Sequence, residues 1–165
     1  MTLHVNLQEF SRPIDLPKSK HLQICGMKIA HQIAALPVRR GQDGLLLVLL
    51  VTSRGTGRWV IPKGWPWPDR DDWLGAAEEA REEAGVLGAA VPTSIGTFTY
   101  HKGQPTGTVA IQVAVYRLEV TEELATWPEC NQRRRSWFTL PEAATVVSEP
   151  ELRDMIIQLP NTTGR

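Results

Sequence analysis

Apolar and polar residues follow two different periods along this chain, one typical of strands and one typical of a helix. Residues 45–51 form an unbroken apolar run of strand length, which predicts a central strand buried on both faces of a sheet. From Trp73 to Ala84, apolar residues recur at spacings of three and four, which predicts a helix with one buried stripe. The chain therefore combines strands with at least one amphipathic helix.

Further strands and helices are indicated by shorter signals. Segments rich in β-branched or aromatic residues and bounded by turn residues predict strands, and they are 24–36, 59–61, 94–102, 108–120 and 135–139. The amphipathic helix is expected to begin at Asp71 or Asp72 and to run to about Ala84, and Pro141 and Pro150 are expected to open two short helices. Strands interleaved with helices predict an α/β fold in which a mixed sheet is sandwiched between helices (α/β/α).

Length and composition narrow the class of protein. A chain of 165 residues predicts one domain, which we place at residues 23–160 between an N-terminal segment (1–22) without a sustained period and a short tail (161–165). Its 18 basic and 18 acidic residues balance, so bulk charge does not favour nucleic acid or an anionic membrane. The two cysteines are too few for a disulfide framework. With no targeting signal and no membrane-length apolar run, we expect a cytoplasmic protein; a homodimer stays open.

Three acids stand out on the predicted helix. Glu79, Glu82 and Glu83 lie on one face, because successive helical residues are turned by about 100°, and they border the apolar stripe. Like charges four residues apart destabilise a helix by roughly 0.2–0.5 kcal/mol unless a cation offsets them. A hard divalent ion is one such cation, since Mg²⁺ is held by carboxylates together with substrate phosphates. A solvated acidic face is the alternative interpretation.

The spacing of these acids from an upstream glycine resembles the Nudix hydrolase box, G-x5-E-x7-R-E-U-x-E-E-x-G-U with U aliphatic. Gly64 stands at the box glycine, the three acids at its metal-binding positions, and Gly85 and Val86 at its end. The resemblance covers about residues 31–158 and implies the Nudix fold, Mg²⁺ (or Mn²⁺) as cofactor and pyrophosphohydrolase activity. It also implies metal ligation by Gly64, Glu79, Glu82 and Glu83, with catalysis through these acids; which of them is the general base stays open.

Two box positions depart from the family pattern. Arg70 stands where the box has its first acid, and Glu78 stands where it has its arginine. Because the two charges are exchanged rather than lost, we expect a structural ion pair of reversed polarity between the loop and the helix.

Basic residues near the box are candidates for phosphate binding. They flank the strands that lead to the box or stand at strand ends, and they are Arg39, Arg54, Arg58, Lys63, Lys102 and Arg133. Each has the alternative of being an ordinary surface cation. The Trp65-Pro66-Trp67-Pro68 insert could stack on a nucleobase or pack against the core.

Residues 59–64 and 133–138 are similar to the Nudix branch that hydrolyses diphosphoinositol polyphosphates and dinucleoside polyphosphates. The resulting hypothesis is an Mg²⁺-dependent hydrolase that cleaves a phosphoanhydride in such a phosphorylated small molecule. The alternatives are a nucleoside-triphosphate or nucleotide-sugar pyrophosphatase, and a Nudix domain that binds its ligand without turning it over.

Overall fold

The computed structural model describes residues 29–160. The predicted segment 1–22, the start of the first strand, Cys25 and the tail 161–165 lie outside the described residues. The helices and strands of the described residues, in chain order, are β1 (Ile29–Arg40), β2 (Leu46–Thr52), β3 (Trp59–Val60), β4 (Lys63–Gly64), α1 (Asp72–Ala84), β5 (Val86–Ala90), β6 (Gly96–Gln104), β7 (Gly107–Glu123), β8 (Arg135–Thr139), α2 (Leu140–Val146) and α3 (Pro150–Ile157).

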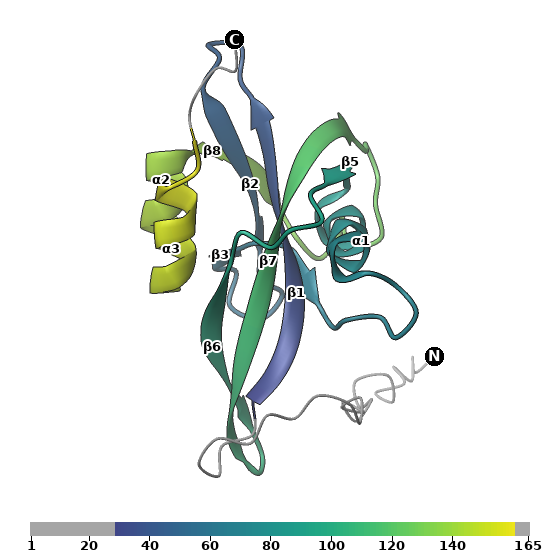
Figure 1. Cartoon of the computed structure of the whole chain (residues 1–165), viewed down its shortest axis with the longest axis vertical. Helices are drawn as coiled ribbons and strands as arrows, with labels where there is room; N and C mark the ends of the chain where they lie inside the picture. Colours follow the sequence, from purple (N-terminus) through teal and green to yellow (C-terminus); the bar gives the residue numbers. More distant parts are fainter. Residues whose placement is uncertain (1–28, 161–165) are drawn as a thin grey trace, which may run out of the picture.

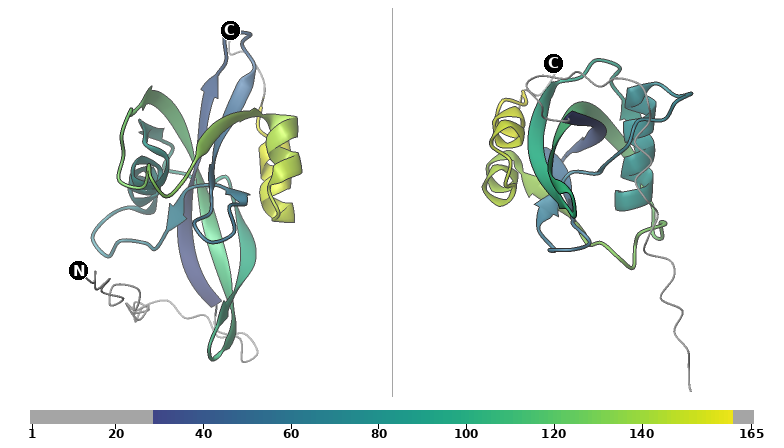
Figure 2. Two further views of the ribbon diagram at one scale, coloured as in Figure 1. Left: turned by 180° about the vertical axis from the view of Figure 1, so that it is seen from behind. Right: turned by 90° about the horizontal axis from the view of Figure 1, so that it is seen from below.

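The strands form one mixed sheet. Its main path is β3-β2-β1-β7-β5, while β4 pairs with β1, β6 with β7 and β8 with β2. The long central pair, β1 and β7, is parallel and runs in register from Ile29↔Ala110 to Val38↔Glu119. The other pairings are antiparallel. Helix α1 lies on one side of this sheet and helices α2 and α3 lie on the other (Figures 1 and 2).

Alternation along β1 builds a core on each face of the sheet. Ala34, Leu36 and Val38 belong to the cluster that includes residues of α2 and α3. Ile33 and Ala35 belong to the cluster that includes the small residues of α1. Because successive strand residues point to opposite faces, one strand supplies both cores, and the predicted α/β/α arrangement is confirmed.

Most predicted elements are present with shifted ends. The amphipathic helix begins at Asp72 and ends at Ala84 as expected, and Gly85 follows it in the left-handed conformation with φ 62°. Leu87 continues the apolar spacing of the helix in the sequence and would be expected on its buried stripe, but it lies beyond the helix in β5. The strand pair β6 and β7 extends to Gln104 and Gly107, so its turn is shorter than predicted. The two short strands β4 and β5 were not predicted.

No helix in residues 29–160 is long and apolar enough to cross a membrane.

Candidate active site

The acids of α1 meet the β4 segment at the centre of the sheet. Lys63 and Gly64 of β4 pair with Ala34 and Ile33 of β1, and α1 packs against that same strand. A β-carbon built on Gly64 would overlap the Glu79 carboxylate. A side chain at this position would therefore force the Glu79 carboxylate to move, whereas glycine lets the backbone approach the acid closely.

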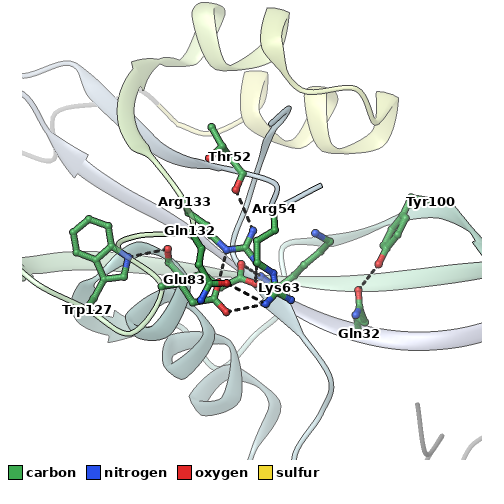
Figure 3. A network of polar contacts seen from close by, with 10 residues as sticks. Gln32, Thr52, Arg54, Lys63, Glu83, Tyr100, Trp127, Gln132 and Arg133 are labelled. Carbon is green, nitrogen blue, oxygen red and sulfur yellow. Dashed lines mark hydrogen bonds and ion pairs between the residues drawn. The ribbon is translucent and has the colours of Figure 1, made fainter. Parts of the chain in front are cut away.

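Glu83 lies deeper than the edge of an apolar stripe would place it. Its residue is buried, with 8% of its surface exposed. One carboxylate oxygen accepts a hydrogen bond from Arg133 Nη2 at 2.6 Å, and the other accepts from the Lys63 backbone N–H at 3.2 Å (Figure 3). Burial raises the pKa of Glu83, while Arg133 and Lys63 act in the opposite direction. These partners are what allow a carboxylate to be buried at this point.

All three guanidinium nitrogens of Arg133 donate hydrogen bonds within the protein. Besides Glu83, it donates to the Thr52 backbone carbonyl at 3.1 Å from Nη1 and to the Glu129 carboxylate from Nε. Its side chain is 7% exposed. The structure thus places this candidate phosphate ligand as the link between helix α1, the end of β2 and the loop before β8.

Glu79 is the acid with unbalanced charge. Its carboxylate has no hydrogen bond or ion pair with any residue in the described range 29–160. Burial, with the nearby charges of Glu83, Glu82 and Glu129, raises the pKa of Glu79 to about 7, and only Arg133 opposes the shift. A cation that binds beside Glu79 would therefore stabilise its ionised form.

Glu129 is a fourth acid of this cluster that sequence reasoning missed. It stands in the loop between β7 and β8, pairs with Arg133 and lies 3.7 Å from Arg54 Nη1. It also raises the pKa values of Glu79 and Glu83. No motif spacing marks it, because its position depends on how the loop folds back onto α1.

Lys63 brings a positive charge to the same place. Its ammonium lies 5.6 Å from the centre of the Tyr100 ring. Burial lowers the pKa of Lys63, Glu83 raises it, and Arg58 and Arg133 lower it further. Tyr100, whose hydroxyl donates to Gln32 Oε1 at 2.7 Å, has its pKa raised to about 12, first by burial. A cation that has lost part of its hydration next to an aromatic ring is suited to bind an anion.

The other candidate cations are spread out. Arg54 has a 60% exposed side chain and lies beside Glu129, whereas Arg58 pairs with the buried Glu149 at 2.7 Å. Lys102 is exposed near the end of β6. Arg39 pairs with Glu123 and covers a tryptophan ring; it stands five residues beyond Ala34 on β1, which is about 17 Å at roughly 3.3 Å per strand residue.

The exchanged box residues do not form the expected direct ion pair. Within the described residues, Glu78 pairs with Arg81 of its own helix at 2.5 Å, and Arg70 lies over the Trp67 ring at 4.8 Å. Arg70 still lowers the pKa of Glu78, after the larger effect of Arg81. Arg70 and Glu78 therefore interact by longer-range electrostatics rather than by a direct ion pair. Of the tryptophan insert, Trp65 packs on the core, while Trp67 is 40% exposed.

The chemistry of the cluster fits a hard cation, although the side chains do not form a closed cage. No group of three or more His, Cys, Asp or Glu side chains in residues 29–160 is arranged to enclose a metal by itself. Mg²⁺ does not require one, since it usually keeps several waters and binds one or two carboxylates plus substrate phosphates. All the donors are oxygens, and the pKa of Glu79 is raised first by burial and then by three neighbouring acids that no ion pair of Glu79 offsets. The residues therefore fit Mg²⁺ or Mn²⁺.

Comparison with known proteins defines the class to which this fold and site belong. Residues 30–159 match the NUDIX domain. The chain belongs to the Nudix family.

Its relatives include Nudix hydrolases and inositol-phosphate enzymes. Nudix hydrolase 16, mitochondrial, of Arabidopsis thaliana is 33% identical over 118 residues, which are 69% of this chain and 65% of that protein. Diphosphoinositol polyphosphate phosphohydrolase 3-beta of Homo sapiens is 33% identical over 108 residues, 64% of this chain and 61% of that protein. The matches thus span less than two thirds of the length of these relatives.

Solved structures share the fold at low identity. The C. elegans Ap4A hydrolase in a binary complex has a TM-score of 0.58 and 18% identity, covering 78% of this chain and 93% of that one. The NUDIX domain of Shewanella oneidensis NrtR complexed with ADP ribose has a TM-score of 0.59 and 14% identity, covering 78% and 86%. Both likenesses concern the fold.

Replacing Glu79 should stabilise the metal-free protein in a pH-dependent way. Because the pKa of Glu79 is raised to about 7, the folded state binds this proton more tightly than the unfolded chain. The acid therefore reduces stability once the pH has risen through both pKa values. With metal removed by a chelator, Glu79→Gln should raise the free energy of unfolding at pH 8 by about 1–3 kcal/mol after allowance for solvent screening. At pH 4 the substitution should change the free energy of unfolding little.

Denaturant titrations at both pH values measure this difference, with Glu122→Gln, an exposed acid of β7, as the control. A gain in stability for Glu79→Gln that is the same at pH 4 and pH 8 would contradict the prediction.

Proposed function

We propose that this chain is an Mg²⁺-dependent hydrolase that cleaves a phosphoanhydride bond in a highly phosphorylated small molecule, such as a diphosphoinositol polyphosphate or a dinucleoside polyphosphate. The observation that carries the proposal is that Glu83 is flanked both by Glu79, an acid without an ion-pair partner among the described residues, and by Lys63, a cation whose ammonium is partly buried. A cation at Glu79 and a phosphate at Lys63 would balance both. Family membership and the names of relatives support the same chemistry.

Glu79, Glu82, Glu83 and the Gly64 carbonyl would hold the metal. When bound, Mg²⁺ neutralises phosphate charge and acidifies the attacking water; Mn²⁺ has the same ligand preferences. Glu79 is the acid best suited to take up the new charge, because no cation pairs with it among the described residues. Glu83 is already held by Arg133 and Lys63, so it would supply a fixed oxygen.

Lys63 would bind the substrate phosphates. Its ammonium has no hydrogen bond or ion pair with the residues described here, so a phosphate oxygen would not have to displace a carboxylate. Arg54 lies at the exposed edge of the acid cluster and would meet a more distant phosphate. Both charges would stabilise negative charge as it develops on the transferred group.

A screen of phosphoanhydride compounds with Mg²⁺ tests the substrate class. Release of phosphate from a diphosphoinositol polyphosphate, or of mononucleotides from a dinucleoside polyphosphate, supports the proposal. Cleavage of nucleoside triphosphates or nucleotide sugars alone would assign the alternative pyrophosphatase activity. Saturable binding without turnover would assign a ligand-binding domain.

A cytoplasmic location and a homodimer are proposals as well; some relatives are named mitochondrial.

Neutralising the helix acids should abolish turnover. Glu79→Gln and Glu83→Gln remove charge at nearly constant shape, so we expect each to lower kcat by about 100-fold or more. Steady-state kinetics across an Mg²⁺ titration measure the loss, with Glu122→Gln as the variant of matched chemistry outside the cluster. Turnover equal to wild type in both variants at saturating Mg²⁺ would remove these acids from the proposed site.

Removing the charge of Lys63 should weaken substrate binding. Lys63→Met keeps an apolar stem but removes the ammonium that lies near Tyr100, and we expect KM to rise by about tenfold or more. The KM of the wild type should also rise with salt, since an exposed charge such as that of Arg54 is screened within about 10 Å at 0.1 M. Arg153→Met serves as the comparison, because Arg153 is an exposed cation of helix α3 that is not among the candidate phosphate ligands. An unchanged KM in Lys63→Met would return Lys63 to a structural role.

A further inference from the structure

The C-terminal end of helix α1 is covered by one segment, residues 124–135. The last carbonyls of a helix have no donors within the helix. Here Glu82 O accepts from the Glu129 backbone N–H at 3.1 Å, and Glu83 O accepts from Trp127 Nε1 at 3.1 Å. Ala84 O accepts from Arg135 Nη1 at 2.8 Å. Three successive carbonyls of the acid-bearing turn are thus satisfied from a single loop.

The residue after the helix completes this contact. Gly85 O accepts from the Leu124 backbone N–H at 2.8 Å and from Arg135 Nη1 at 3.0 Å. A β-carbon on Gly85 would stand 2.6 Å from Trp127 Cδ2 and 2.7 Å from Arg135 Nη1. The guanidinium of Arg135 lies 4.1 Å from the Trp127 ring centre. The two side chains fill the space that a glycine leaves beside the helix end.

The same segment carries charged groups into the acid cluster. Glu129 follows Trp127 by two residues, and its backbone is fixed on Glu82 while its side chain pairs with Arg133. Arg133 in turn binds Glu83. If the segment slipped along the helix, Glu129 and Arg133 would both move relative to Glu83. The register of the loop on α1 therefore sets the geometry of the cluster.

Trp127 is the contact best placed to set that register. Its indole N–H binds the backbone of Glu83 itself (Figure 3), whereas Arg135 binds the two residues that follow. We propose that Trp127 is a positioning residue: its bond to the Glu83 carbonyl fixes where the Glu129 carboxylate stands relative to Glu79 and Glu83. The catalytic consequence rests on the proposed hydrolase function; the structural consequence does not.

The chain contains a matched control tryptophan. Trp137 of β8 also donates its indole N–H to a glutamate, Glu123 Oε1 at 3.0 Å, and also lies under an arginine, Arg39 at 4.2 Å. Both rings are partly buried. Trp127→Phe and Trp137→Phe each remove one indole hydrogen bond and keep an aromatic ring. The Trp127 bond ends on α1 itself, whereas the Trp137 bond ends on Glu123, which lies 4.0 Å from Arg135, so the two variants differ in whether the lost bond ends on the helix.

Two readouts separate positioning from general stability. By amide hydrogen exchange, Trp127→Phe should increase the exchange rate of the Glu129 N–H by about threefold to tenfold, the factor of one ordinary hydrogen bond, and Trp137→Phe should leave it unchanged. With the substrate found by the screen, Trp127→Phe should lower kcat by about the same factor with KM within about twofold, and raise the half-saturating Mg²⁺ concentration. Trp137→Phe should change neither.

Equal exchange at Glu129 and equal kcat in the two variants would overturn the proposal. If Trp127→Phe does not fold, the exchange of the Trp127 indole N–H and of the Glu129 backbone N–H is measured in the wild type at increasing denaturant; the proposal requires the two groups to open together, and separate opening overturns it. If the wild type hydrolyses no compound of the screen, the proposed function fails, and the exchange of the Glu129 amide alone decides whether Trp127 sets the loop.

Discussion

The acid cluster depends on one buried guanidinium. Arg133 joins Glu83 of α1, the Thr52 carbonyl at the end of β2 and Glu129 of the loop before β8. Three elements that are distant in sequence therefore meet at one side chain. A buried arginine of this kind is tolerated only when its donors are satisfied, and here each of the three nitrogens makes a contact. Without it, Glu83 would be a buried acid facing Glu129 and Glu79 with only Lys63 to compensate.

The negative charge of Glu79 is not neutralised by an ion pair among the described residues. Arg133 neutralises the deeper part of the cluster, but Glu79 is partly buried and remains close to three other acids, and these two effects, burial first, raise its pKa to about 7. Such a group is a cost to the folded state at neutral pH. A site that is to gain a cation requires this kind of residual charge, because a fully paired set of carboxylates would have nothing to offer it. Stability and the proposed metal binding thus oppose each other at a single residue.

The parts of the site that follow from local sequence could be predicted, and the parts that follow from long-range contacts could not. The helical period alone places Glu79, Glu82 and Glu83 together, and Gly85 marks the helix end because it adopts positive φ. Glu129 and Trp127 have no such signal: they belong to an irregular loop whose course is set by contacts with α1. The two-residue strand β4 was missed for a similar reason, since only its pairing with β1 makes it a strand.

The same distinction explains the exchanged box residues. An ion pair between Arg70 and Glu78 was expected from the exchange of charge alone, but Glu78 has a nearer partner at i+3 on its own helix, Arg81. Arg70 instead lies on Trp67, a residue of the aromatic insert that precedes the helix. The loop is therefore joined to its surroundings by ring contacts, with Trp67 beside Gly75 of α1 and Trp65 on the core. In this chain, aromatic packing can hold the loop before α1 without a direct ion pair between Arg70 and Glu78, while Gly64 stays against Glu79.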